Sequence, residues 1–309
     1  MRAASLCAWF AVLVAVAGAA HADITFDNQP DTTGTFILDV RSEAECERAS
    51  LAGASCLATN RVLGPNRRLP NVSGLLWLLG TVGLTGDEHV VIVGDSDEDK
   101  TFMAGLLYLT GQKKITVMTQ RLSELKSAAM APGAARSRTR QKVFQAPMRD
   151  DSVILRRELL MTIAANQPVT IVDMRSEAEY WGRKLRAPRG GHIPGAILFS
   201  PDDAPARGSS VIIYGHDTVD GLVALARLVS QGGSGRALMD GWAGWAADGA
   251  LPVDALTFAD TSRHQPQAEK APPPAYYGSP RLLIAAGVLV LIAFSAGYFV
   301  RWLTAGKKE

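Results

Sequence analysis

A chain of 309 residues has room for two domains of ordinary size, each large enough to bury its own core. Its formal net charge of +2 gives no reason to expect a nucleic acid as partner. Hydrophobic residues make up 47% of the chain, but the excess lies at the two ends, so the middle has the composition of an ordinary globular protein.

The first 22 residues have the pattern of a signal peptide. Arg2 precedes an apolar run over residues 6–17, and small residues end in the sequence Ala-His-Ala at 20–22. A charged start, an apolar centre and an A-x-A site together predict cleavage after Ala22. The alternative is an N-terminal membrane anchor that is not removed.

Two ten-residue runs, 36–45 and 170–179, resemble each other. Each is a short apolar strand that ends in Asp-x-Arg and continues into Ser-Glu-Ala-Glu. The serine with glutamates behind it suits the N-terminal cap of a helix, where the helix dipole favours acidic side chains. A repeat at a spacing of about 134 residues predicts two duplicated domains, which we place at 23–125 and 151–254.

Short apolar runs alternate with helical patterns in both halves. Further strands are expected at 89–93, 115–118, 196–199, 211–214 and 237–239, and helices at 75–82, 101–109, 153–165 and 219–230. This alternation predicts two α/β domains, each with a mostly parallel sheet covered by helices on both faces.

Two cysteines remain once Cys7 has left with the signal peptide. Cys46 and Cys56 both fall in the first domain, and in an oxidising compartment such a pair is a disulfide candidate. A separation of ten residues does not fix their geometry, so two buried, unpaired thiols are equally compatible with the sequence.

Two segments of low periodicity are expected to act as linkers. Residues 126–150 are rich in Ala, Pro, Arg and Ser and are interpreted as a solvated interdomain linker. Their basic side chains could alternatively form a patch for an acidic partner: Arg136, Arg138, Arg140 and Lys142. Residues 255–280 contain three consecutive prolines and are predicted to be a semi-extended spacer.

A second apolar segment lies near the C-terminus. Residues 282–300 form a run of 19 residues without a charge, which is about long enough to cross a hydrocarbon core. Tyrosine and tryptophan flank the run, and the basic tail at 304–309 favours a cytoplasmic C-terminus. We therefore predict a transmembrane helix at 281–303; the alternative is a buried core helix.

Together the two ends predict a single-pass protein with most of its chain outside the cytoplasm. The composition, rich in Ala, Arg and Gly, favours a bacterial host, and hence the inner membrane and the periplasm.

The second domain carries several motifs in a specific order. After Asp173-Met174-Arg175 come Gly191-His192-Ile193-Pro194-Gly195-Ala196, then Val211-Ile212-Ile213-Tyr214, and finally Asp240-Gly241-Trp242-Ala243-Gly244-Trp245. This series resembles the rhodanese, or thiosulfate sulfurtransferase, family. Asp39-Val40-Arg41 extends the resemblance to the first domain, but Ser50-Leu51-Ala52-Gly53-Ala54 stands where the family has His-Ile-Pro-Gly-Ala. The resemblance therefore implies a tandem protein whose first domain is degenerate.

The resemblance implies catalysis by a cysteine that opens a short loop after the strand ending at Tyr214. Backbone N–H groups and a helix N-terminus around the sulfur would lower the pKa of the thiol and hold a persulfide. Gly215 occupies this position here, and Gly94 occupies it in the first domain. The second-domain loop is Gly215, His216, Asp217, Thr218, Val219 and Asp220.

Without sulfur in either loop, neither domain has the nucleophile of the family, and the acidic residues of both loops would repel an anionic sulfur donor. The resemblance implies that Arg189 helps to bind anionic substrates. Asp95, Asp97 and Asp99 alternate as in a calcium loop, but the twelfth position is Leu106, so neither a metal nor a cofactor is expected.

The sequence thus predicts a non-catalytic binding or scaffold module, with a possible link to sulfur metabolism, whose partner is a protein or a small anion. The alternative is a sulfurtransferase or sulfur carrier that uses Cys46 or Cys56.

Overall fold

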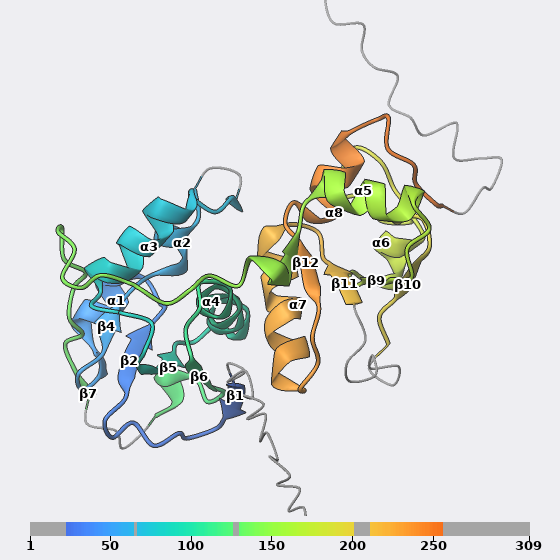
Figure 1. Ribbon diagram of the computed structural model, residues 1–309. Coiled ribbons are helices and arrows are strands. Elements are labelled where there is room, and N and C mark those ends of the chain that lie inside the picture. Colours follow the sequence, from blue (N-terminus) through green and yellow to red (C-terminus); the bar gives the residue numbers. More distant parts are fainter. Residues whose placement is uncertain (1–22, 65–66, 126–129, 201–210, 256–309) are drawn as a thin grey trace, which may run out of the picture. The chain divides into compact units, whose positions relative to one another are not determined.

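The computed structural model describes residues 23–64, 67–125, 130–200 and 211–255 (Figure 1). All of them belong to one compact unit. The predicted signal peptide, most of the proline-rich spacer, the predicted transmembrane helix and the tail lie outside the described residues. Among the helices that are described, none is long and apolar enough to cross a membrane.

The first sheet is parallel throughout and has the strand order β4-β2-β5-β6-β1. Its central strand, β5, is buried over Val90–Val93, as expected for a parallel strand covered on both faces. The strands are β1 (Asp23–Asp27), β2 (Phe36–Asp39), β4 (Ser55–Cys56), β5 (His89–Val93) and β6 (Lys114–Met118). The helices of this half are α1 (Glu43–Arg48), α2 (Thr59–Val62), α3 (Val72–Thr81) and α4 (Asp97–Leu109).

The second sheet repeats this arrangement, with the strand order β10-β9-β11-β12-β8 and parallel pairing throughout. Its strands are β8 (Val153–Ile154), β9 (Thr170–Asp173), β10 (Ala196–Leu198), β11 (Val211–Tyr214) and β12 (Arg236–Leu238). Its helices are α5 (Arg156–Ala164), α6 (Glu177–Tyr180), α7 (Thr218–Ser230) and α8 (Gly241–Ala247). Two α/β halves with parallel sheets are therefore confirmed. The patterns missed β1 and β4, the two edge strands of the first sheet, and β8, an edge strand of the second. The helix predicted over 153–165 is wrong at its start, because residues 153–154 form β8 and α5 begins at Arg156.

Both copies of the Asp-x-Arg motif tie the end of a strand to a loop. The guanidinium of Arg41 donates to the carboxylate of Asp39 at 2.6 Å and to the carbonyl of Ala49 at 2.7 Å. Asp173 and Arg175 make the same pair, and Arg175 also donates to a loop carbonyl at 2.7 Å. Asp39 and Asp173 are fully buried, so the paired charge is needed at both positions.

The helix starts predicted from the repeat are also present. Ser42 accepts a hydrogen bond from the N–H of Glu45, whose carboxylate accepts one from the Ser42 N–H, and Ser176 and Glu179 repeat this capping box. The repeat in the sequence therefore corresponds to a repeat in local structure.

The two halves share one hydrophobic core through helices α4 and α7, which lie side by side (Figure 1). A Cβ atom on Gly105 would lie 2.2 Å from the backbone oxygen of Leu222, so only glycine permits this helix–helix distance. Leu106 and Leu225 are fully buried in the shared core.

Residues 130–150 connect the two sheets, but they pack against the first half. Most of the segment is exposed, as expected of a solvated linker, but parts of it make ordered contacts with the first half. Strand β7 (Met130–Ala131) pairs antiparallel with β3 (Ser50–Leu51), and Phe144 is buried in the core. The carbonyl of Lys142 passes so close to Gly80 that a Cβ there would lie 2.3 Å from it. Composition alone did not reveal these contacts, because the residues that the segment packs against lie far from it in the sequence.

Candidate functional site

Equivalent loops follow the central strand of each sheet. In the first half Gly94 follows β5 and leads into α4, and in the second half Gly215 follows β11 and leads into α7. The structure therefore places both glycines where the resemblance expected them, between a parallel strand and a helix N-terminus.

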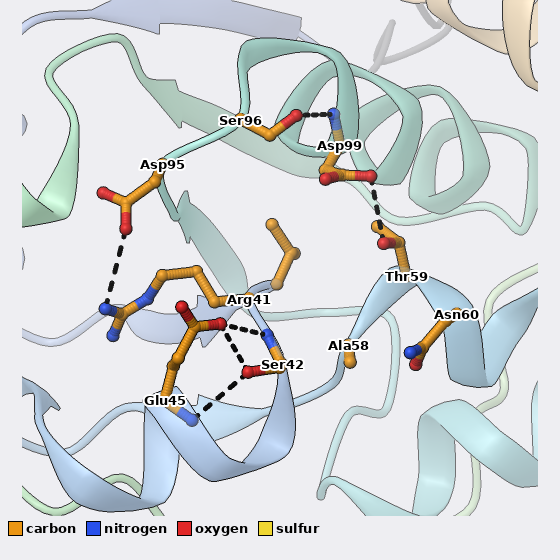
Figure 2. Close-up of a pocket in the computed structure, with 10 residues that line it drawn as sticks. Arg41, Ser42, Glu45, Ala58, Thr59, Asn60, Asp95, Ser96 and Asp99 are labelled. Carbon is orange, nitrogen blue, oxygen red and sulfur yellow. Dashed lines mark hydrogen bonds and ion pairs between the residues drawn. The ribbon is translucent and has the colours of Figure 1, made fainter.

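The first loop opens onto a pocket of about 230 Å³, shown in Figure 2. We call it the first-domain pocket. Its walls come from the start of α1, from the start of α2 and from the loop before α4. The lining residues are Val40, Arg41, Ser42, Glu45, Ala58, Thr59, Asn60, Asp95, Ser96 and Asp99. The sequence had singled out Asp95 and Asp99 here, but not Thr59 and Asn60, which come from a short helix that no pattern had predicted.

Negative charge dominates the lining of this pocket. Glu45 accepts hydrogen bonds from the hydroxyl and the N–H of Ser42, which lower the pKa of its carboxyl group. Asp99 accepts a hydrogen bond from the hydroxyl of Thr59 at 3.0 Å. Arg41 lies 3.8 Å from Asp95 (Figure 2), but its guanidinium is already bonded to the buried Asp39. Three carboxylates therefore face a single guanidinium, so a free anion would be repelled here.

The second loop satisfies its own amide groups with carboxylates. Asp217 caps α7 by accepting hydrogen bonds from the N–H groups of Val219 at 2.9 Å and Asp220 at 3.2 Å. Asp220 in turn accepts the N–H of His216 at 3.0 Å. The backbone donors that an anion would use at such a turn are thus bonded to side chains of the loop itself.

The space available to an added Cβ atom differs between the two glycines. A Cβ at Gly215 would lie 2.2 Å from the Cβ of Asp220 and 3.1 Å from its backbone carbonyl carbon. At Gly94 the nearest atom to such a Cβ would be a methyl of Val40 at 3.0 Å. A side chain can therefore be added to the first loop with a small adjustment, but not to the second unless its backbone moves.

His216 is half-buried, and its Nδ1 atom has no hydrogen-bond partner among the described residues. Burial, and next the charge of Arg186, lower the pKa of its imidazole. A neutral ring in this position can accept or donate a proton, but the loop has no cysteine for it to activate, and the hydroxyl of Thr218 donates to the carbonyl of Met239.

Arg67 connects the two loops, and no sequence pattern had predicted this contact. Its guanidinium lies 2.9 Å from the carboxylate of Asp217 in the second loop and 3.4 Å from that of Glu98, at the start of α4. These ion pairs link the two loops at the protein surface, where such pairs contribute little to stability.

Arg189, expected to help bind anions, has a structural role instead. Its guanidinium donates to the carbonyls of Trp245, Ala246, Asp248 and Leu251, which lie at and beyond the C-terminal end of α8. Carbonyls at a helix end need such donors. The guanidinium of Arg189 is therefore engaged by backbone carbonyls.

Cys46 and Cys56 form a disulfide in the structure, with their Cα atoms 5.8 Å apart. Both residues are fully buried, and neither lines the first-domain pocket. Of the two alternatives that the sequence left open, the structure has the disulfide. No group of three or more His, Cys, Asp or Glu side chains in the described part of the chain could hold a metal ion.

Comparisons with known proteins agree on the fold. No protein-family model matches the sequence, and no curated protein matches it. Among solved structures, a probable thiosulfate sulfurtransferase is similar at 24% identity, with a TM-score of 0.55 over 74% of this chain and 99% of that one. YnjE is similar at 16% identity, with a TM-score of 0.58 over 77% of this chain.

EanB, solved in complex with ergothioneine, is similar at 16% identity, with a TM-score of 0.54 over 75% of this chain. The chain spans 64% of YnjE and 65% of EanB, less than two thirds of either. These matches show that the chain has a tandem rhodanese-like fold.

Proposed function

We propose that this protein is a non-catalytic rhodanese-like binding module that presents the first-domain pocket to a protein partner outside the cytoplasm. The observation that carries the proposal is the packing at Gly215, where the carbon that would bear a catalytic sulfur has no room beside Asp220. Asp220 occupies the space that a cysteine side chain at position 215 would need.

The alternative, sulfur transfer by Cys46 or Cys56, has less support. A sulfur carrier needs a thiolate that a donor can reach. Both residues are fully buried, their sulfurs are joined to each other, and neither follows the central strand of a sheet.

A protein fits the first-domain pocket better than a small anion does. The carboxylates of Glu45, Asp95 and Asp99 disfavour an anion, while Asn60 and Thr59 add polar groups that can bind a peptide. Of the two partner classes considered from the sequence, we therefore propose the protein.

An assay for sulfur transfer tests the lack of catalysis directly. We expect the purified full-length protein to convert thiosulfate and cyanide to thiocyanate no faster than a heat-treated sample of the same protein. An active rhodanese, assayed alongside, shows that the assay can detect turnover. Turnover above the heat-treated sample would overturn the proposal.

The binding role can be tested by photo-crosslinking in membranes. A photoreactive amino acid in place of Asn60, which is exposed at the rim of the pocket, should capture a specific protein band. The same amino acid in place of Gln167, which is exposed in the second half, should not capture it. Equal capture from both positions would count against a partner at the pocket.

The membrane topology is proposed from the sequence alone. A signal peptide at 1–22 and a transmembrane helix at 281–303 would hold the two domains in the periplasm, with the basic tail in the cytoplasm. Alkaline phosphatase fused after residue 255 should then be active, and fused after residue 309 it should be inactive. The opposite pattern would reverse the topology.

A further inference from the structure

We infer that the Cys46–Cys56 disulfide is a redox control on the first-domain pocket: while it is intact it holds two walls of the pocket together, and its reduction loosens them. The inference rests on the proposed function, because it concerns the same pocket. It assigns to the cysteines a regulatory role that is distinct from sulfur transfer.

The disulfide joins the two elements that supply these walls. Cys46 lies in α1, directly after Glu45, which lines the pocket. Cys56 ends β4, two residues before the lining segment 58–60. The covalent bond is therefore one residue away from one wall and two residues away from the other.

The other interactions that link these two walls are non-covalent. Helix α2 has only four residues, and no side chain caps its N-terminus. An ion pair between Arg61 and Glu43, 3.0 Å apart, links α2 to α1, but the Arg61 side chain is 54% exposed. An ion pair with such exposure contributes little to stability. The disulfide adds a covalent bond to these non-covalent links between the walls.

A segment from the connection between the two halves covers the disulfide. We call residues 130–134 the strap. The N–H of Gly133 donates to the carbonyl of Cys46, and the N–H of Cys56 donates to the carbonyl of Ala134, both at 2.9 Å. A Cβ on Gly133 would lie 2.5 Å from the sulfur of Cys46 and 2.8 Å from that of Cys56. The strap therefore lies directly on both sulfurs, and a reductant reaches them only when it opens.

The chemistry is a two-electron thiol–disulfide exchange with a dithiol reductant. One thiolate of the reductant attacks either sulfur and breaks the S–S bond, which gives a mixed disulfide and one protein thiolate. The second thiol of the reductant then displaces the other cysteine. The reductant leaves as a cyclic disulfide, and its two protons end on Cys46 and Cys56.

Hydrogen exchange of the full-length protein tests the effect on the pocket. With dithiothreitol, we expect amide exchange in residues 42–48 and 57–62 to become at least tenfold faster, while residues 211–230 keep their protection. The double variant C46S/C56S should exchange like the reduced protein and should not respond to dithiothreitol.

A second measurement keeps both cysteines in place. The variant G133A puts a methyl group against both sulfurs, so the strap should open more often and dithiothreitol should reduce the disulfide at least tenfold faster. The variant P132A, which changes an exposed neighbour in the strap, should be reduced at the wild-type rate. Alkylation followed by intact mass measures both rates.

Three results would overturn the inference: free thiols at Cys46 and Cys56 before reduction, unchanged exchange around the pocket after reduction, or loss of protection throughout the protein. Each is independent of the thiocyanate assay. A sulfurtransferase activity would therefore refute the proposed function without deciding this point, and unchanged exchange would refute redox control without restoring catalysis.

Discussion

The two loops after β5 and β11 share a position in the fold, yet they differ in what fills the space beside the glycine. Beside Gly94 a pocket of about 230 Å³ is open, with its carboxylates at the walls. Beside Gly215 the carboxylates of Asp217 and Asp220 have turned inward onto the backbone N–H groups.

The two loops thus differ in how their backbone N–H groups find hydrogen-bond acceptors. Buried N–H groups without partners cost free energy. In the second loop, the carboxylates of the loop itself accept these N–H groups. In the first loop the hydroxyl of Ser96 accepts only the N–H of Asp99 among the described contacts, and the space remains available to a partner.

The largest expected effect comes from restoring the cysteine. The variant G215C should lower the free energy of unfolding by about 2–3 kcal/mol, because the new Cβ would overlap Asp220. The matched variant G94C should cost less than about 1 kcal/mol, since only a methyl of Val40 must shift. Urea unfolding measures both. Equal losses would mean that the two loops are alike after all.

A double variant can locate the source of the overlap. In G215C/D220G the Cβ of residue 220 is gone, so the loss should be smaller than the sum of the two single losses by about 1 kcal/mol. In G215C/D220A that Cβ remains, and the two losses should simply add. Rescue by alanine as well as by glycine would point to the charge of Asp220 rather than to its position.

Much of the fold could be predicted because its signals are local. Strands β5 and β11 were predicted with the bounds that the structure has, since both are short apolar runs between polar turns. The Asp-x-Arg pairs and the serine caps could be read from adjacent residues. The glycines at the two cysteine positions were located by the order of the motifs around them.

The rest of the site depends on contacts between distant segments. Arg189 bonds to the end of α8, and Arg67 pairs with Asp217. No pattern among neighbouring residues in the sequence indicates either contact. The strap was interpreted as part of a solvated linker because residues 126–150 are rich in Ala, Pro, Arg and Ser and show little periodicity, although Gly133 fits against two sulfurs. Composition records the residues of a segment but not the shape of the surface on which it lies.

The capping residues of α7 and α4 should differ in how much they contribute to the free energy of unfolding. Asp217 accepts two N–H groups of α7, so D217A should cost about 1–2 kcal/mol. Ser96 accepts only one of α4, at 3.2 Å, so S96A should cost about 0.5–1 kcal/mol. Thermal and urea unfolding of the two variants side by side decide the order. A larger loss for S96A would contradict the view that the second loop depends more on its own carboxylates.

The smallest expected effect is a pH dependence of the free energy of unfolding that arises from the second loop. Burial lowers the pKa of His216 below its ordinary value of 6.5, so the unfolded chain binds a proton before the folded one does as the pH falls. Stability should therefore be greatest above about pH 7 and should decline through 6.5 until the pH passes below the folded-state pKa.

The variant H216Q should flatten part of this decline, with stability compared at a series of pH values between about 5 and 8. His89, whose pKa is also lowered by burial, accounts for another part, so H89Q serves as the control in the first half. Parallel curves of stability against pH for H216Q and the wild-type protein would contradict this expectation. They would show that the ring of His216 is solvated well enough to titrate as it does in the unfolded chain. The second loop would then be more open than its hydrogen bonds indicate.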